Sequence, residues 1–317
     1  MSPFLPLTSP FPTVLLKPLV TFSLPPALPW PVEALKMAIA PALPGLTVEV
    51  LAEVDSSNSE LMRRFKSPSP LRRPLLLVAE QQSAGRGRLG RSWQSQRADS
   101  LTFSLGLSLQ PQDWSGLSLA VGVSVAESLA PLTEGSDYRI GLKWPNDVWL
   151  CGPEGERKLA GILVETGSWE GQRYVVIGVG VNVRPVAVPV SAPSPNPQAQ
   201  AAIAPACLQD FAPGIDAAQA LLHIAPRLVQ AVQAFEQFGF TPFQARFARY
   251  DVLEGRMVSL SDAGQGTAHG VTEDGALLVL TALGMKTVTS SEVSVRPLPR
   301  QARATAGAPC TKDGLPC

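Results

Sequence analysis

Hydrophobic and polar positions alternate in several short stretches of the first 183 residues, a pattern typical of strands with one buried face. The clearest is Leu101–Leu109 (LTFSLGLSL), whereas the continuous apolar run Pro74–Glu80 (PLLLVAE) is typical of a buried strand. The same criteria predict further strands at Thr47–Val54, Ile140–Trp144, Ala160–Glu165 and Tyr174–Val181.

Other stretches repeat apolar residues at helical spacing. Ser115–Leu129 is predicted to be a helix that packs one face on a sheet, and Asp216–Phe238 a helix that Pro226 breaks or kinks. Shorter helices are expected at Val32–Ala40, at Phe243–Tyr250 and after Asp55, where Ser57 and Glu60 form a capping-box pattern. Strands mixed with helices in this way favour an α+β domain, with a mixed sheet and helices mainly on one face.

The pattern changes after Val252, where glycines separate five short β runs. Asp274-Gly275 is a strong hairpin signal between two of them. The runs are Met257–Ser261, Thr267–Val271, Ala276–Thr281, Lys286–Thr289 and Val293–Val295. Five short strands within about 45 residues predict a small barrel.

The segment Ala79–Ser95 (AEQQSAGRGRLGRSWQS) carries the most distinctive chemistry. Its glycines allow the backbone to approach a ligand closely, and its arginines are planar forks suited to carboxylate and phosphate oxygens. These are Gly85, Gly87 and Gly90 with Arg86, Arg88 and Arg91. We expect a loop that closes around an anion.

Two general motifs are similar to this segment. It contains the dinucleotide-binding fingerprint G-x-G-x-x-G, and it nearly matches the Walker A loop. Both require the loop to open directly into a helix. Here Trp93–Ser100 is polar and a second strand follows, so the loop is predicted to join two strands. A solvated basic hairpin loop is the remaining alternative.

Four further segments accompany this loop: DSSNSE at 55–60, KWPND at 143–147, KLAGILVE at 158–165 and GVGVN at 178–182. In this order, with GRGRLGR between the first and second, they resemble the biotin–protein ligase family from about Val48 to Arg296. The resemblance implies a class II synthetase-like catalytic domain followed by an SH3-like barrel. It also implies activation of biotin with ATP to biotinyl-5'-AMP, and transfer to a lysine of the biotin carboxyl carrier protein of acetyl-CoA carboxylase.

The resulting domain prediction divides the chain into four parts. Residues 1–45 form a proline-rich segment and 46–250 the biotin- and ATP-binding domain, with a proline-rich insertion at 184–213. Residues 251–298 form the SH3-like domain, and 299–317 a tail. The first segment has room for one short helix, so we expect the monofunctional form of the family, without the winged helix-turn-helix of its repressor members.

The resemblance implies three catalytic residues. Lys158 is expected against the biotin carboxylate and the α-phosphate, and Arg88 is the main clamp of the loop. Asp147 is expected to orient or deprotonate the acceptor lysine. The structural alternatives are a solvated lysine at a strand entrance for Lys158 and an Asx turn after Pro145 for Asp147.

Polar partners for the biotin ureido group, in an otherwise apolar pocket, are expected from the residues that match family positions. Ser57 has a helix cap as its alternative role, and Trp93 either covers the ligand or packs in the core. The predicted biotin-binding residues are Ser56, Ser57, Asn58, Gln82, Arg86, Gly87, Arg88, Trp93, Lys158 and Gly161. The predicted ATP-binding residues are Arg88, Arg91, Lys143, Asn146, Asn182 and Arg296.

Composition narrows the remaining possibilities. The 26 basic and 26 acidic residues balance, which argues against an extended nucleic-acid-binding surface. Four cysteines without C-x-x-C spacing and two distant histidines predict no zinc site. Mg²⁺ is expected to arrive with ATP, without a dedicated set of protein ligands. No apolar run is long enough to span a membrane, and free thiols favour a cytoplasmic enzyme.

Two other functions are compatible with a chain of this kind. A lipoate–protein ligase shares the fold and the adenylate chemistry, but carries a glycine-triplet loop with a nearby histidine that this sequence lacks. A non-catalytic binding protein on the same scaffold would not need Arg88, Lys158 and Asp147 together.

Overall fold

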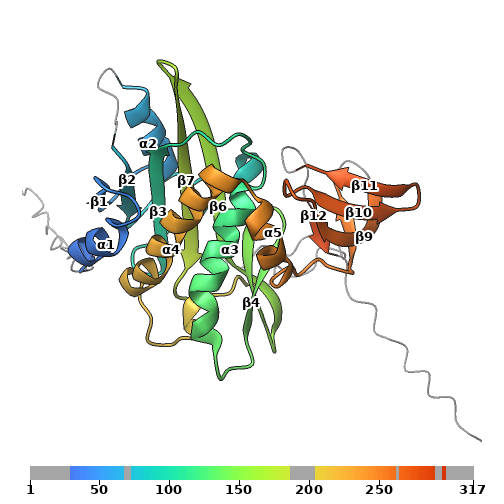
Figure 1. Ribbon diagram of the computed structural model, residues 1–317. Helices are drawn as coiled ribbons and strands as arrows, with labels where there is room; N and C mark the ends of the chain where they lie inside the picture. Colours follow the sequence, from blue (N-terminus) through green and yellow to red (C-terminus); the bar gives the residue numbers. More distant parts are fainter. Residues whose placement is uncertain (1–28, 68–72, 186–203, 262–263, 290–294, 298–317) are drawn as a thin grey trace, which may run out of the picture.

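In the computed structural model, a seven-stranded mixed sheet forms the centre of the molecule (Figure 1). The structure describes residues 29–67, 73–185, 204–261, 264–289 and 295–297. The strand order is β1-β2-β3-β7-β6-β5-β4, with β1 and β2 parallel and every other neighbouring pair antiparallel. The strands are β1 Thr47–Leu51, β2 Leu75–Ala79, β3 Ser100–Ser108, β4 Arg139–Lys143, β5 Asp147–Gly152, β6 Gly155–Trp169 and β7 Gln172–Asn182.

Of the five α-helices in the described residues, four gather on one side of this sheet, as the sequence predicts, while α2 packs on the other (Figure 1). The helices are α1 Val32–Ile39, α2 Ser57–Phe65, α3 Leu117–Leu129, α4 Ala217–Phe238 and α5 Thr241–Ala248. None of the helices in the described residues combines the length and the apolar composition that crossing a bilayer requires.

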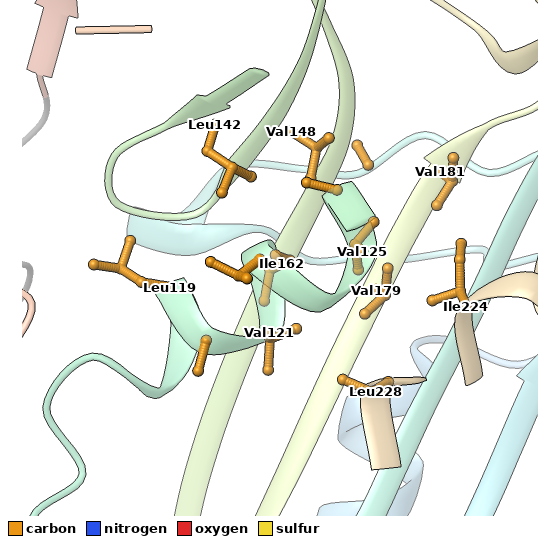
Figure 2. Close-up of a cluster of buried hydrophobic side chains, with 14 of the residues drawn as sticks. Leu119, Val121, Val125, Leu142, Val148, Ile162, Val179, Val181, Ile224 and Leu228 are labelled. Atoms are coloured by element: carbon orange, nitrogen blue, oxygen red, sulfur yellow. The ribbon is translucent and has the colours of Figure 1, made fainter. Parts of the chain in front are cut away.

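The main core lies between the sheet and helices α3 and α4 (Figure 2). Ile162 of β6 and Val179 of β7 point from the sheet toward Val121 of α3 and Leu228 of α4. These side chains are at most 2% exposed. Since side chains alternate along a strand, the neighbours of Ile162 and Val179 face the opposite side of the sheet.

A second, five-stranded antiparallel sheet follows in the order β11-β10-β9-β8-β12. It confirms the predicted run of short strands. Its strands are β8 Met257–Leu260, β9 Gly264–Val271, β10 Leu277–Thr281, β11 Gly284–Val288 and β12 Val295–Pro297. The Trp144 indole joins the two parts of the molecule, since its Nε1 donates to the carbonyl of Gly275 at 3.0 Å. Arg256 adds an ion pair to Glu156.

Two helices are more deeply packed than the pattern predicts. Pro226 does not break its helix, because α4 continues through it with buried residues on both sides, including Ala225 and Leu228. Helix α3 packs on the sheet as predicted, and α4 and α5 cover most of its remaining surface. The pattern also missed β5 and the full length of β6.

Candidate functional site

A single row of residues across the sheet forms the base of the main pocket. The strand register places Lys143 opposite Asp147, Asp147 opposite Gly161, and Gly161 opposite Gly180. Because directly opposed residues share a face of the sheet, these side chains point away from α3 and α4. The next row brings Leu163, Gly178 and Ser104 together on the same face.

A β-bulge in β6 brings Lys158 to this face. Val148 pairs with Ala160 and Trp149 with Lys158, so Leu159 is the extra residue. Without the bulge, Lys158 and Gly161 would lie on opposite faces, since they are three positions apart. With it, a Cβ built on Gly161 would lie only 3.2 Å from Lys158 Nζ. The strand irregularity therefore assembles the predicted lysine and glycine into one site.

Asp147 lies between two cations. Its Oδ1 is 2.7 Å from Lys158 Nζ, and its Oδ2 is 3.8 Å from Lys143 Nζ. The side chains of Asp147 and Lys143 are 15% and 12% exposed, whereas that of Lys158 is 40% exposed and reaches toward the open pocket. Lys158 is therefore a paired side chain of the site rather than a freely solvated lysine.

The arginine loop is a short hairpin closed by its own backbone. Gly87 N–H donates to the Arg91 carbonyl at 2.7 Å, and Trp93 N–H donates to the Gly85 carbonyl at 2.8 Å. A single 3-10 turn at Arg88–Gly90 forms the tip, and no α-helix follows before β3. The loop therefore joins two strands, as predicted, and has neither the dinucleotide-binding nor the Walker A geometry.

The two central arginines of this loop point in different directions. Arg86 pairs with Glu165 of β6 at 3.0 Å and also donates to Ser59 Oγ at 3.1 Å. Arg88 turns toward the lysines and donates to Asn146 Oδ1 at 3.4 Å. Burial lowers the pKa of Arg88, an effect that the charge of Asp147 opposes. A guanidinium nevertheless stays protonated in proteins.

Asn146 connects Arg88 to the sheet. Its Nδ2 donates to the Ile162 carbonyl at 2.8 Å, and its backbone carbonyl accepts from Ile162 N–H at 3.0 Å. Asn146 lies in the turn between β4 and β5, as the KWPND motif predicts.

Trp93 packs across the glycine row. A Cβ on Gly180 would lie 2.4 Å from the indole ring, so only glycine leaves room for Trp93 there. Lys158 Nζ lies 5.9 Å from the ring centroid. The indole Nε1 is buried and has no hydrogen-bond partner among the described residues, which makes it a donor that a ligand could satisfy. Trp93 thus both packs against the sheet and lines the pocket.

The start of α2 supplies the polar end of the pocket. Ser56, rather than the predicted Ser57, is the N-cap, and its Oγ accepts from Ser59 N–H at 3.4 Å. The capping-box prediction was therefore wrong by one residue. Ser57 is held instead by Gln82, whose Oε1 accepts from Ser57 N–H at 2.7 Å.

An ion pair fixes this end of the helix from outside. Both oxygens of Asp55 accept from Arg63 at 2.8 Å, which lowers the pKa of the Asp55 carboxyl to about 2. Asp55 Oδ1 also accepts from Ser56 N–H at 2.8 Å. The three serine and asparagine residues that follow are buried, so their positions depend on how the helix begins.

The pocket brings together all but two of the predicted site residues and has about 900 Å³ of empty space, including its open mouth. Asn182 lies outside the lining, buried at the end of β7, where its Nδ2 donates to the Ala206 carbonyl at 2.9 Å. Arg296 lies in β12 opposite Ser259, but its side chain is outside the described residues. The neighbouring Val295 does line the pocket, so the second sheet contributes to the site.

Several lining residues were not predicted. They occupy the pocket face of β3, β6 and β7. The sequence pattern that could have identified them is the alternation of small or polar residues with large apolar ones in buried strands, as in Ser-Leu-Thr-Phe-Ser and Gly-Val-Gly-Val. They include Thr102, Leu163, Gly178 and Gly180, with Ser104 directly behind them.

Comparison with known proteins identifies this arrangement. Residues 51–182 match a family model described as "Biotin/lipoate A/B protein ligase family", and residues 255–296 match the "Biotin protein ligase C terminal domain". The chain is 34% identical over 277 residues to the bifunctional ligase/repressor BirA of Escherichia coli, covering 85% of this chain and 81% of that protein. The chain belongs to the biotin/lipoate A/B protein ligase family.

Other members of this family support the same assignment. A biotin–[acetyl-CoA-carboxylase] ligase of Paracoccus denitrificans is 30% identical, over 77% of this chain and 98% of that protein. The biotin protein ligase of Aquifex aeolicus, solved in complex with biotin and ATP, is 30% identical. It superimposes with a TM-score of 0.62 and covers 79% of this chain and 99% of that chain. The resemblance read from the motifs, and the fold it implied, are confirmed.

One part of the prediction remains open. The described residues before β1 contain a single helix, α1, as expected. Residues 1–28 lie outside the described residues, as do 186–203 and the tail with Cys310 and Cys317. The domain limits and the absence of a DNA-binding unit stay predictions.

Proposed function

We propose that this protein is a biotin–protein ligase, which activates biotin with ATP to biotinyl-5'-AMP and transfers the biotinyl group to a lysine of a biotin carboxyl carrier protein. The observation that carries the proposal is the charge of the pocket. Five cationic side chains and one carboxylate line it, the carboxylate being Asp147. Such a pocket attracts a triphosphate and a carboxylate together, although these anions repel each other.

The first step requires the biotin carboxylate oxygen to attack the α-phosphorus of ATP while the bond to pyrophosphate breaks. Negative charge then accumulates between the carboxylate and the α-phosphate. Lys158 is placed to stabilise it, because its ammonium group projects into the pocket beside the glycine row. We infer that Lys158 exchanges its contact with Asp147 for a contact with the reacting anions.

Arg88 has a different task in this proposal. It is fixed by Asn146 and covers the pocket from the loop, so its guanidinium can hold the phosphate of the adenylate after pyrophosphate has left. Lys143 and Arg91 extend the positive charge toward the remaining phosphates. The roles proposed for Asn182 and Arg296 toward the nucleotide rest on the resemblance alone.

In the second step, the amine of the acceptor lysine attacks the acyl carbon and AMP leaves with the C–O bond electrons. The amine must lose a proton on the way. Asp147 is the only carboxylate among the described lining residues, and we propose that it orients the amine and receives this proton. Release of Asp147 by Lys158 during adenylation would prepare it for this role.

Mg²⁺ fits the site only as a companion of the nucleotide. Asp147 is already engaged by Lys158 and Lys143, and no group of three or more potential metal-ligating side chains occurs among the described residues. We propose that ATP phosphates and water hold the ion. A cytoplasmic location likewise stays a prediction, compatible with the free, buried thiol of Cys207.

Exchange of labelled pyrophosphate into ATP tests the proposal. We expect exchange that depends on biotin and does not respond to lipoate, followed by transfer of labelled biotin to a carrier domain. Exchange with lipoate alone would establish a lipoate ligase instead. Binding of biotin without any exchange would establish a non-catalytic binding protein. The match of residues 255–296 to a biotin protein ligase domain supports the first outcome.

A further inference from the structure

The segment 206–210 lies beside Lys158, where strands β6 and β7 separate. The pairing of β6 with β7 begins at Ala160, so it does not extend to Lys158. Ala206 N–H instead donates to the Lys158 carbonyl at 2.9 Å. From the side of β7, Asn182 Nδ2 donates to the Ala206 carbonyl at 2.9 Å. The segment therefore takes the place of β7 next to Lys158.

This part of β6 needs support, because the bulge at Leu159 interrupts its pairing with β5. At a bulge the extra residue stays outside the hydrogen-bond ladder and the strand bends. The Lys158 carbonyl faces the segment 206–210 rather than β5, since it accepts from Ala206. The segment thus helps to fix the backbone from which the Lys158 side chain enters the pocket.

Asp210 ties the same segment to β6 a second time. Its Oδ2 lies 2.9 Å from Arg157 Nη2, and it also accepts from Cys207 N–H at 3.1 Å. Arg157 directly precedes Lys158 in the chain, and Cys207 directly follows Ala206. The carboxylate therefore closes a ring around the backbone hydrogen bond between the segment and β6. The side chains of Arg157 and Asp210 are 14% and 20% exposed, and solvent screens such a partly buried pair less than a surface pair.

The Cys207 thiol holds the other oxygen of this carboxylate. Its Sγ lies 3.2 Å from Asp210 Oδ1, and the two contacts form a capping box at the 3-10 turn Leu208–Asp210. Burial raises the pKa of the thiol to about 11, so Cys207 keeps its proton and donates. Both oxygens of Asp210 thus have donors within the protein. Such a carboxylate is suited to holding the backbone rather than to binding a ligand.

We propose that Asp210 is a positioning residue for adenylation, which acts through Arg157 and the segment 206–210 to hold Lys158 at the reacting anions. The inference rests on the proposed function, in which the Lys158 ammonium leaves Asp147 to contact these anions. The position of its backbone then decides where the ammonium lies. A displacement of about 1 Å can slow an enzymatic step about a hundredfold.

The test is a double-mutant cycle between Asp210→Ala and Lys158→Ala. The quantity measured is the rate constant of single-turnover adenylation at saturating biotin and ATP. In the wild-type background, Asp210→Ala should lower this rate constant about tenfold. In the Lys158→Ala background it should have no further effect, because no ammonium is left to position.

A purely structural role for Asp210 would give a different result. Loss of folded protein lowers the amount of adenylate formed, whereas the rate constant at saturation reports only the molecules that are folded. An equal effect of Asp210→Ala in both backgrounds, or an unchanged rate constant in the wild-type background, would overturn the proposal. A normal rate constant in Lys158→Ala would overturn it too, since Asp210 would then have no lysine to act through.

Asp216→Ala is the matched control. Asp216 belongs to another capping box, at the start of α4, where it accepts from Gln219 N–H at 2.8 Å. Its replacement should leave the rate constant of adenylation unchanged. A fall equal to that in Asp210→Ala would assign the effect to the loss of any capping carboxylate and contradict the proposal.

Arg157→Met provides a second route if Asp210→Ala fails to fold, because it removes the ion pair and leaves the turn at 207–210 intact. The rate constant should fall in the wild-type background and stay unchanged in the Lys158→Ala background. An unchanged rate constant in folded Arg157→Met alone would overturn the proposal. Failure of the proposed function is distinguishable, because the wild type would then show no biotin-dependent exchange of pyrophosphate.

Discussion

The two faces of the central sheet consist of alternate residues of the same strands, yet they have opposite properties. On the helix side, Ile162, Val179 and Val181 are buried against α3 and α4. On the pocket side, Gly161, Gly178 and Gly180 leave the backbone bare, and side chains from elsewhere fill the space. One face stabilises the fold through apolar burial, while the other leaves room for a ligand.

Two aspartates, one in the pocket and one outside it, have different surroundings. Asp147 on the pocket side has Lys158 and Lys143 beside it. Asp251 lies where the chain leaves the first sheet beside Leu142, and its Oδ2 is buried without a hydrogen-bond partner among the described residues. The comparison indicates that substitutions on the pocket face should change activity, and that those on the helix side should change stability.

The largest expected effect belongs to the helix side. Ile224→Ala in α4 removes a fully buried side chain, and we expect a loss of about 2–5 kcal/mol in the free energy of unfolding. Urea unfolding measures it. Single-turnover adenylation by the folded protein should be nearly unchanged, and a matching loss of activity would show that the two faces are coupled.

Asp251 should make stability depend on pH. Burial raises the pKa of its carboxyl from 3.8 to about 6. The folded state therefore binds a proton that the unfolded state releases, and stability falls as pH rises from about 4 to 6, by about 3 kcal/mol at 1.4 kcal/mol per unit. Asp251→Asn should lack this fall. If the pH profiles of unfolding for variant and wild type are parallel, the assignment is wrong. Exposed Glu53→Gln, which lies away from Asp251 in the chain, is the control.

On the pocket side, Lys158→Ala should slow adenylate formation about ten- to a hundredfold, because a charge-assisted contact of about 1.5–3 kcal/mol is lost in the reacting complex. Single-turnover kinetics measure this step, and the free energy of unfolding should change little. Exposed Lys66→Ala is the control for loss of a lysine. A normal adenylation rate in Lys158→Ala would mean that Lys158 takes no part in this step.

The smallest effect is expected in Arg88→Ala. The finished adenylate should dissociate about tenfold faster from this variant, because one charge-assisted contact is weakened. A tenfold change corresponds to about 1.4 kcal/mol. Release of labelled biotinyl-adenylate, chased with unlabelled biotin, measures it. Retention equal to that of the wild type would mean that the hairpin loop does not clamp the intermediate.

The sequence predicted the fold class and most of the pocket, because the pocket residues come from loops and turns with distinctive composition. It could not show that Lys158 and Gly161 share a face, since strand periodicity alone places them on opposite sides and the bulge depends on pairing with β5. Ser104 escaped notice because a buried serine is recognisable only once its partners are known. Pro226 does not break α4, because tertiary packing outweighs the local cost of a proline.

The bulge at Leu159 also determines which changes of chain length the protein tolerates. Deleting this residue would leave β5 and β6 able to pair in regular register, so the sheet itself would survive. Lys158 would then stand two positions from Gly161, opposite Trp149 as before, and would stay on the pocket face. A one-residue deletion in the regular part of β6 has no extra residue to absorb it, so the strand on one side of the deletion would turn over and its pocket residues would face the helices. Loss of Leu159 should therefore be better tolerated than loss or gain of one residue in the regular part of β6.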